Sequence, residues 1–140
     1  MRRLTLLVVV LIAAAGASSG RSSTASQPQQ RFFFTPGPNG ANCEIDLVPD
    51  LPRRVFCAIE PPKVKASKAI GATLTPSGRL VICHGLKCVG NAPQGERKLR
   101  YGHSISLGPF RCTAYRRGVH CIVKSLGSGF LLTRRSVTPE

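Results

Sequence analysis

Alternating apolar and polar positions predict two β-strands in the last third of the chain, over residues 110–115 and 118–124. The apolar members of the two runs are Phe110, Cys112, Ala114, Val119, Cys121 and Val123. A period of two places one set of side chains toward a core and the other toward solvent. Shorter runs of β-forming residues predict further strands over 32–34, 43–48, 53–59, 80–83 and 129–133.

Turn-forming residues separate these runs. Residues 35–40 read Thr-Pro-Gly-Pro-Asn-Gly, Pro76-Ser77-Gly78 divides two apolar runs, and Gly118 closes a short hairpin loop. Helical periodicity nowhere exceeds about two turns, and its best candidate is 63–70, which Pro61 and Pro62 could open. We therefore expect an all-β fold, a small disulfide-stapled sandwich or partly open barrel built from hairpins.

The N-terminus is typical of a secretory signal peptide. Arg2 and Arg3 precede an uncharged run over 4–15, and Ala15-Gly16-Ala17 fits the small-x-small cleavage rule. The alternative is a membrane anchor, but the run is shorter than the roughly 20 residues that a spanning helix needs. We assign residues 1–17 to the signal peptide and expect no transmembrane segment after its cleavage. Localisation is therefore predicted to be secreted or extracytoplasmic, in the cell envelope.

The rest of the chain divides into a linker, one domain and a tail. Residues 18–30 are expected to be a flexible linker, because they carry no aliphatic side chain larger than Ala. A single β-rich, disulfide-bonded domain is predicted over 31–135, and residues 136–140 are expected to be frayed. Removal of 17 residues leaves 123 of the 140, and loss of Arg2 and Arg3 lowers the formal charge from +14 to +12.

Six cysteines follow the signal peptide, which is an even number in a chain directed to an oxidising compartment. They allow 15 pairings. Two pairs end β-like runs joined by short turns, and a third pair encloses only four residues, so local pairing is favoured. The predicted disulfides are Cys43–Cys57, Cys83–Cys88 and Cys112–Cys121.

The rival interpretation of these cysteines is a zinc site. Cys83 and Cys88 with His84 and His103 have suitable ligand types, but no second closely spaced ligand pair accompanies them. We therefore expect no metal and no cofactor.

Three motifs near the C-terminus resemble those of a known family. Residues 101–112 are similar to YGxSIxxGxFxC, 118–121 match GVxC, and 127–134 look like GxGFxLSR. The pattern resembles a family of small exported actinobacterial proteins of unknown function. The resemblance implies a compact, β-rich, disulfide-bonded exported domain, and no catalytic residues can be carried over. The family's CxGDT is absent at Cys83, and the resemblance implies that Cys88 replaces a lost partner of that cysteine.

Charge is the feature with functional content. Lys and Arg total 20 against 6 Asp and Glu, and such an excess attracts polyanions at low salt. Lys63, Lys65 and Lys68 form one basic group. The other groups supply the candidate polyanion-binding residues, which are Arg53, Arg54, Arg97, Lys98, Arg100, Arg116, Arg117, Arg134 and Arg135. The alternative is a basic surface that only keeps the domain in solution.

These features favour a non-enzymatic binding or structural module of the cell envelope or secreted fraction. Its expected partner is an anionic envelope polymer or a membrane surface, and the domain is expected to be a monomer. Specific nucleic-acid recognition is not expected, because no binding motif is visible. One alternative is a small secreted enzyme that uses His103 with Ser104 or Ser106, although no orienting acid or catalytic motif accompanies them. Another alternative is a secreted inhibitor or toxin-like minidomain.

Overall fold

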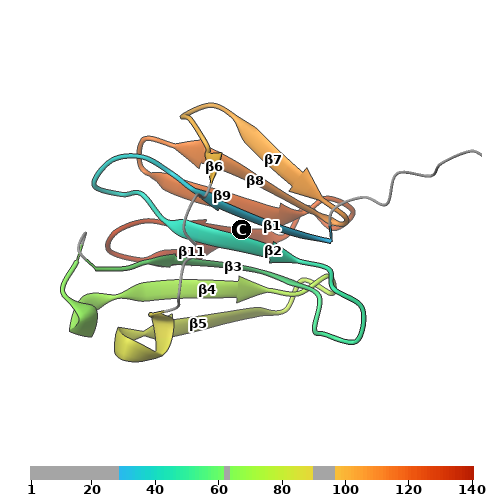
Figure 1. Ribbon diagram of the computed structural model, residues 1–140, viewed down its shortest axis with the longest axis horizontal. Helices are drawn as coiled ribbons and strands as arrows, with labels where there is room; N and C mark the ends of the chain where they lie inside the picture. The colour runs from blue at the N-terminus through green and yellow to red at the C-terminus, as the bar shows by residue number, and fades with distance from the viewer. Residues whose placement is uncertain (1–28, 62–63, 90–96) are drawn as a thin grey trace, which may run out of the picture.

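The computed structural model describes residues 29–61, 64–89 and 97–140, which form two β-sheets packed face to face (Figure 1). The predicted signal peptide and linker residues 18–28 lie outside the described residues. The strands of the described ranges form no closed barrel. The prediction of a disulfide-stapled all-β fold is therefore confirmed, and the architecture is the sandwich.

The first sheet is an antiparallel meander with one added parallel strand. Its order is β5-β4-β3-β2-β1-β6, and β6 runs parallel to β1. Its strands are β1 (Gln30–Phe34), β2 (Asn42–Asp46), β3 (Arg54–Ile59), β4 (Ile70–Leu74), β5 (Leu80–His84) and β6 (Arg97–Lys98). Two short 3-10 turns, η1 (Ala66–Lys68) and η2 (Gly85–Cys88), flank β4 and β5.

The second sheet is antiparallel throughout, in the order β11-β10-β9-β8-β7. Its strands are β7 (Ser104–Leu107), β8 (Phe110–Tyr115), β9 (Gly118–Val123), β10 (Gly129–Leu132) and β11 (Val137–Pro139). Hairpin turns join its neighbours, as the alternating sequence pattern predicts. In Figure 1, β5 forms the lower edge of the molecule and β7 the upper edge.

The predicted alternation separates core from surface. In β8 and β9 the apolar set is fully buried, whereas Arg111 and Tyr115 between its members are exposed. Phe33 of β1 and Phe130 of β10 are also fully buried and belong to the same cluster. Burial of large apolar side chains from both sheets supplies the main favourable free energy of the fold.

All three predicted disulfides are present, as Cys43–Cys57, Cys83–Cys88 and Cys112–Cys121. Two of them join directly opposed residues of neighbouring strands, since Cys43 pairs with Cys57 in the β2–β3 register and Cys112 with Cys121 in the β8–β9 register. These two disulfides meet in the middle of the sandwich, where the sulfur atoms of Cys57 and Cys121 are 3.7 Å apart. Each sheet thus contributes one bridge to a buried sulfur contact between the sheets.

The prediction that residues 136–140 are frayed is wrong, because this segment forms β11 along the free edge of β10. Leu131 pairs with Thr138, and the N–H groups of Gly129 and Glu140 each donate to the other residue's carbonyl oxygen, at 2.7 and 3.0 Å. A carboxylate oxygen of Glu140 also lies 2.8 Å from His120 Nε2. The segment has little apolar pattern of its own, so pairing with a buried strand decides its conformation.

Deletion of residues 137–140 is expected to lower the free energy of unfolding by about 2–3 kcal/mol, because backbone hydrogen bonds and the packing of Val137 are lost. Urea denaturation followed by circular dichroism would measure the change. The control is Glu140→Gln, which removes only a partly exposed ion pair and should change stability by less than about 1 kcal/mol. A truncated chain as stable as the full chain would contradict the assignment of β11.

Two other predicted boundaries are wrong. The helical candidate 63–70 forms only the single turn η1, because Ile70 already belongs to β4 and pairs with Ile59. Lys63 lies outside the described residues. The linker ends earlier than residue 30, since Gln30 pairs with Asp46 in β1, and the Leu47 N–H donates to the carbonyl oxygen of Gln29 at 2.6 Å.

Candidate anion-binding surfaces

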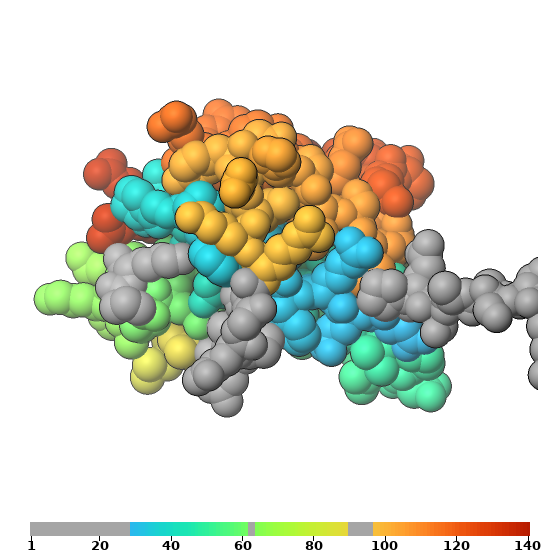
Figure 2. Space-filling view, turned by 45° about the horizontal axis from the view of Figure 1, so that its top comes forward, coloured from blue at the N-terminus to red at the C-terminus, as the bar shows by residue number. Residues whose placement is uncertain are grey.

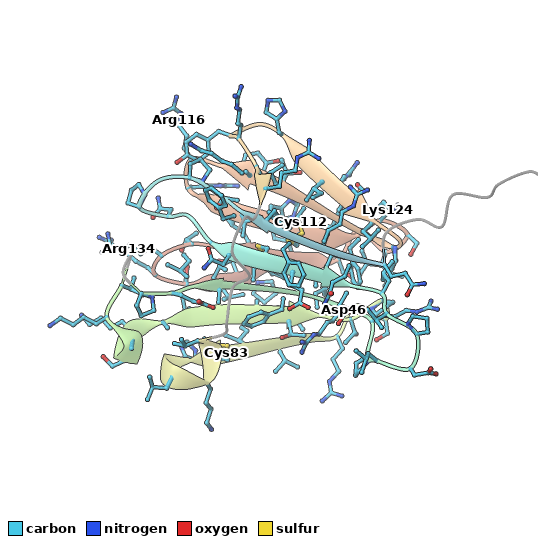
Figure 3. All side chains as sticks on the ribbon, in the orientation of Figure 1. Asp46, Cys83, Cys112, Arg116, Lys124 and Arg134 are labelled. Atoms are coloured by element: carbon cyan, nitrogen blue, oxygen red, sulfur yellow. A yellow bond between two sulfur atoms is a disulfide. The ribbon has the colours of Figure 1, made fainter. Side chains whose placement is uncertain are left out.

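Three basic groups that are far apart in the sequence lie at one end of the sandwich. Lys65 directly precedes η1 and Lys68 ends it, before β4 starts. Two arginine pairs come from the β8–β9 and β10–β11 turns. Figure 3 shows Arg116 and Arg134 extending from this end, with Lys124 at the opposite end. We call this surface the basic end, formed by Lys65, Lys68, Arg116, Arg117, Arg134 and Arg135, all of them exposed.

The turn that carries Arg134 and Arg135 is held by its flanking residues. The Thr133 hydroxyl accepts hydrogen bonds from the N–H groups of Arg135 at 3.2 Å and Ser136 at 3.1 Å. The Thr133 N–H donates to the Ser136 carbonyl oxygen at 2.8 Å. Such side-chain bonds to the backbone fix a tight turn, so both guanidinium groups are presented from a defined position.

The turn that carries Arg116 and Arg117 is tied to the first sheet. The Arg116 guanidinium lies 5.6 Å from the centre of the Tyr101 ring, and the Tyr101 hydroxyl donates to the Pro36 carbonyl oxygen at 2.8 Å. The Asn39 amide donates to the Arg116 carbonyl oxygen at 3.1 Å. The Arg117 guanidinium lies 6.0 Å from the centre of the Tyr115 ring. These contacts orient both cations without neutralising them.

Two shallow hollows at the basic end share Arg134 and Arg135. One, of about 400 Å³, is also lined by Val64, Lys65 and Lys68. The other, of about 430 Å³, is lined in addition by Pro38, Asn39, Arg117 and Thr133. The shared arginines make the two hollows one continuous basic surface, which suits an extended anionic chain better than a single small ligand.

The structure does not bring every predicted basic residue to this end. Arg54 is the first residue of β3 and pairs with Asp46, so Arg53 and Arg54 lie at the opposite end of the strands. Arg97, Lys98 and Arg100 lie along the open side of the sandwich, near the β6 edge of the first sheet and the β7 edge of the second. The sequence-predicted cations therefore form three separate groups.

The third group lines a pocket of about 350 Å³, which we call the side pocket. Its lining residues are Arg31, Arg97, Lys98, Leu99, Arg100, His103, Ser104, Ile105 and Ser106. Figure 2 looks onto this side of the molecule, where residues near 100 (orange) lie over the first strand (blue). Sequence reasoning missed Arg31, although Arg31 shares the strand parity of the apolar Phe33.

His103 lies in the side pocket together with Ser104 and Ser106, as the enzyme alternative requires. The described lining of this pocket contains no Asp or Glu that could orient the imidazole. The Ser104 hydroxyl is hydrogen-bonded to the Thr113 hydroxyl at 2.7 Å. The arrangement therefore supplies positive charge and hydroxyl groups but not the acid–base pair of a hydrolytic triad.

The cysteines are committed to disulfides. Cys83 and Cys88 are bonded to each other, so they do not supply the thiolates of the zinc site considered above. The sulfur atoms of Cys57, Cys112 and Cys121 lie within 4.8 Å of one another, but all three belong to disulfides. Three disulfides in a chain of this size are typical of proteins that fold in an oxidising, extracytoplasmic setting.

Comparisons with protein-family models, curated proteins and solved structures found no match to this chain. The resemblance of about residues 32–135 to a family of small exported actinobacterial proteins of unknown function therefore stays a prediction. Within the described residues, no helix has the length and apolar character needed to cross a bilayer.

Proposed function

We propose that this protein is an exported, non-enzymatic binding domain that attaches to anionic polymers of the cell envelope through its basic end. The observation that carries the proposal is the convergence of cations from three separate segments onto one surface. A basic composition does not by itself place cations together, because they can be spread over the whole surface. In this fold, six described cations lie at one end.

The physical basis of the proposed binding is the strong positive potential that neighbouring cations create together. Neighbouring cations raise the local concentration of an anionic polymer more than isolated cations do, and the attraction weakens as salt screens it. Arginine guanidinium groups also bind phosphate and carboxylate groups with two parallel hydrogen bonds. Two arginine pairs on fixed turns can therefore contact successive anionic groups along one polymer chain.

Export and disulfide bonding support the same proposal. The predicted signal peptide would deliver the domain to a compartment where three disulfides persist. The anionic polymers available there are those of the envelope. A binding module also needs no catalytic centre, and the described side chains at the basic end are cationic, neutral polar or apolar.

The test is binding of the oxidised full-length protein to immobilised poly(glycerol phosphate), measured by surface plasmon resonance over a range of salt concentrations. Substitution of Arg117, Arg134 and Arg135 together by Gln should weaken binding at low salt at least about tenfold and flatten its salt dependence. Loss of three adjacent cations lowers the positive potential at the basic end and removes three groups that contact the polymer.

The matched control replaces Arg53, Arg54 and Lys124 by Gln. This variant loses the same net charge from the opposite end, and Figure 3 shows Lys124 there. We expect its affinity to fall by less than about threefold, because general attraction depends only weakly on distant charges. Equal losses in the two variants would overturn the assignment of binding to the basic end.

A further inference from the structure

We propose that the side pocket is a separate binding site for a compact ligand carrying a phosphate monoester or diphosphate group. The inference goes beyond the proposed attachment to envelope polymers, because it concerns a different surface and a different size of ligand. It rests on the position of Arg31 and Arg97, at the open edge of the first sheet, beside the free edge of β7 in the second sheet.

Two arginines lie on the inner face of the first sheet, at its open edge. In β1, Arg31 has the same parity as Phe33, which is fully buried in the core. In β6, Arg97 pairs with Phe33 in the parallel register and therefore shares its face. Both guanidinium groups thus project into the space between the two sheets, where the second sheet does not cover them.

The opposite wall of the pocket is β7, the edge strand of the second sheet. Ala114 N–H donates to the His103 carbonyl oxygen at 3.0 Å, so His103 faces β8. Antiparallel pairing alternates along the strand, which directs the backbone N–H groups of Ser104 and Ser106 toward the free edge. This edge therefore offers backbone N–H donors beside the inner-face arginines. Ser104 and Ser106 alternate with the buried Ile105 and Leu107, so their side chains lie on the outer face of the second sheet.

The mouth of the pocket carries further positive charge. Lys98 and Arg100 flank the buried Leu99, whose N–H donates to the Phe34 carbonyl oxygen at 2.8 Å and anchors the segment. His103 follows in a turn closed by its own N–H to the Arg100 carbonyl oxygen at 3.1 Å. All of these side chains line one pocket, whose described lining contains no carboxylate.

This set of groups matches phosphate chemistry. A phosphate offers several acceptor oxygens and up to two negative charges, which suit paired guanidinium groups and backbone N–H donors. The volume of about 350 Å³ is at the lower end of the roughly 300–1,000 Å³ typical of small-ligand sites. Inward charges at a sheet edge also hinder edge-to-edge association, but that role needs neither the pocket nor the surrounding donors.

The test is a titration of the isotopically labelled, oxidised full-length protein with inorganic pyrophosphate, followed by two-dimensional NMR. We expect saturable one-to-one binding with amide shifts centred on Ser104 and Ser106, whose N–H groups face the free edge of β7. Substitution R31Q/R97Q should weaken binding at least about tenfold. If that variant fails to fold, R31K/R97K keeps the charge but loses the two-pronged donor, and it should weaken binding several-fold.

Two control variants separate this inference from the proposed function. R53Q/R54Q, and the basic-end variant R117Q/R134Q/R135Q, should bind pyrophosphate like the unmodified protein. Shifts that spread over all basic surfaces without saturating, or equal weakening in the controls, would overturn the site. If the unmodified protein binds pyrophosphate but does not bind the polymer, only the basic-end proposal is overturned.

A second titration distinguishes the source of the phosphate. A short glycerol phosphate oligomer presents the same chemistry as a repeating unit, whereas pyrophosphate presents it as a free anion. If the oligomer shifts the same amides and R31Q/R97Q abolishes those shifts, the pocket holds a phosphate of the envelope polymer. If only pyrophosphate does so, the ligand is a free phosphorylated molecule.

Discussion

Replacement of Cys43 and Cys57 together by alanine is expected to lower the free energy of unfolding by about 3–5 kcal/mol. The bridge closes a loop with a sequence separation of 14, so its removal enlarges the conformational freedom of the unfolded chain. Its sulfur atoms are also buried, and the contact with Cys121 across the sheets is lost. Guanidinium denaturation of the purified double variant would measure the change.

The matched control is the double variant C83A/C88A. This bridge closes a separation of only 5 and lies outside the main core, against a small satellite cluster. The chain-entropy relation gives it about 2 kcal/mol. A loss for C43A/C57A no greater than that for C83A/C88A would contradict the importance of the buried contact between sheets.

Gly129→Ala is expected to destabilise the domain by at least about 3 kcal/mol, although it adds a single methyl group. A Cβ at Gly129 would collide with the Cys121 carbonyl oxygen and lie 2.8 Å from Ile122 Cα. Both atoms belong to the backbone of β9, which cannot move without disturbing the β8–β9 pairing. Thermal unfolding followed by circular dichroism, together with denaturant titration, would measure the loss.

Gly127→Ala is the control for this prediction. Gly127 has a φ of +70°, yet no heavy atom lies within 4 Å of an added Cβ. The expected loss of stability is then about 1–2 kcal/mol, the energy cost of a left-handed backbone conformation for a residue with a Cβ. If the two variants were equally stable, steric contact between β9 and β10 would not be the reason for glycine at position 129.

The hairpins and disulfides could be predicted because their signals are local. Phe110, Cys112 and Ala114 alternate clearly, Gly118 marks the turn, and the following strand repeats the alternation. Cysteines placed near the ends of adjacent strands then fall opposite one another, as Cys112 and Cys121 do. Each of these inferences needs only neighbouring residues.

Two of the strands that were missed, β6 and β11, have little sequence pattern of their own. β6 contains only Arg97 and Lys98, and it is a strand because Phe33 and Phe34 pair with it. β11 ends on Pro139, which lacks an N–H but is tolerated at the edge of a sheet. Neither segment has a periodic pattern, so no strand was predicted at residues 97–98 and a frayed tail was predicted at 136–140.

Dependence on distant partners also explains why the candidate sites could be predicted only in part. The basic pairs were visible in the sequence, but strand order decides which of them meet. Lys65 and Arg134 are neighbours around one hollow although 69 positions separate them. Arg31 was the one member of the side pocket that strand parity could have singled out, since it lies two positions before the buried Phe33.

The cross-strand bridges also set a limit on how far this molecule can be stretched. Under a pulling force, chain held between Cys43 and Cys57 cannot extend even after the sheets separate. With about 3.3–3.6 Å of reach per residue, a span of 14 residues withholds about 50 Å of contour length. A domain tethered to a surface that grows or is sheared would therefore lengthen by about 50 Å less than the same chain without this bridge.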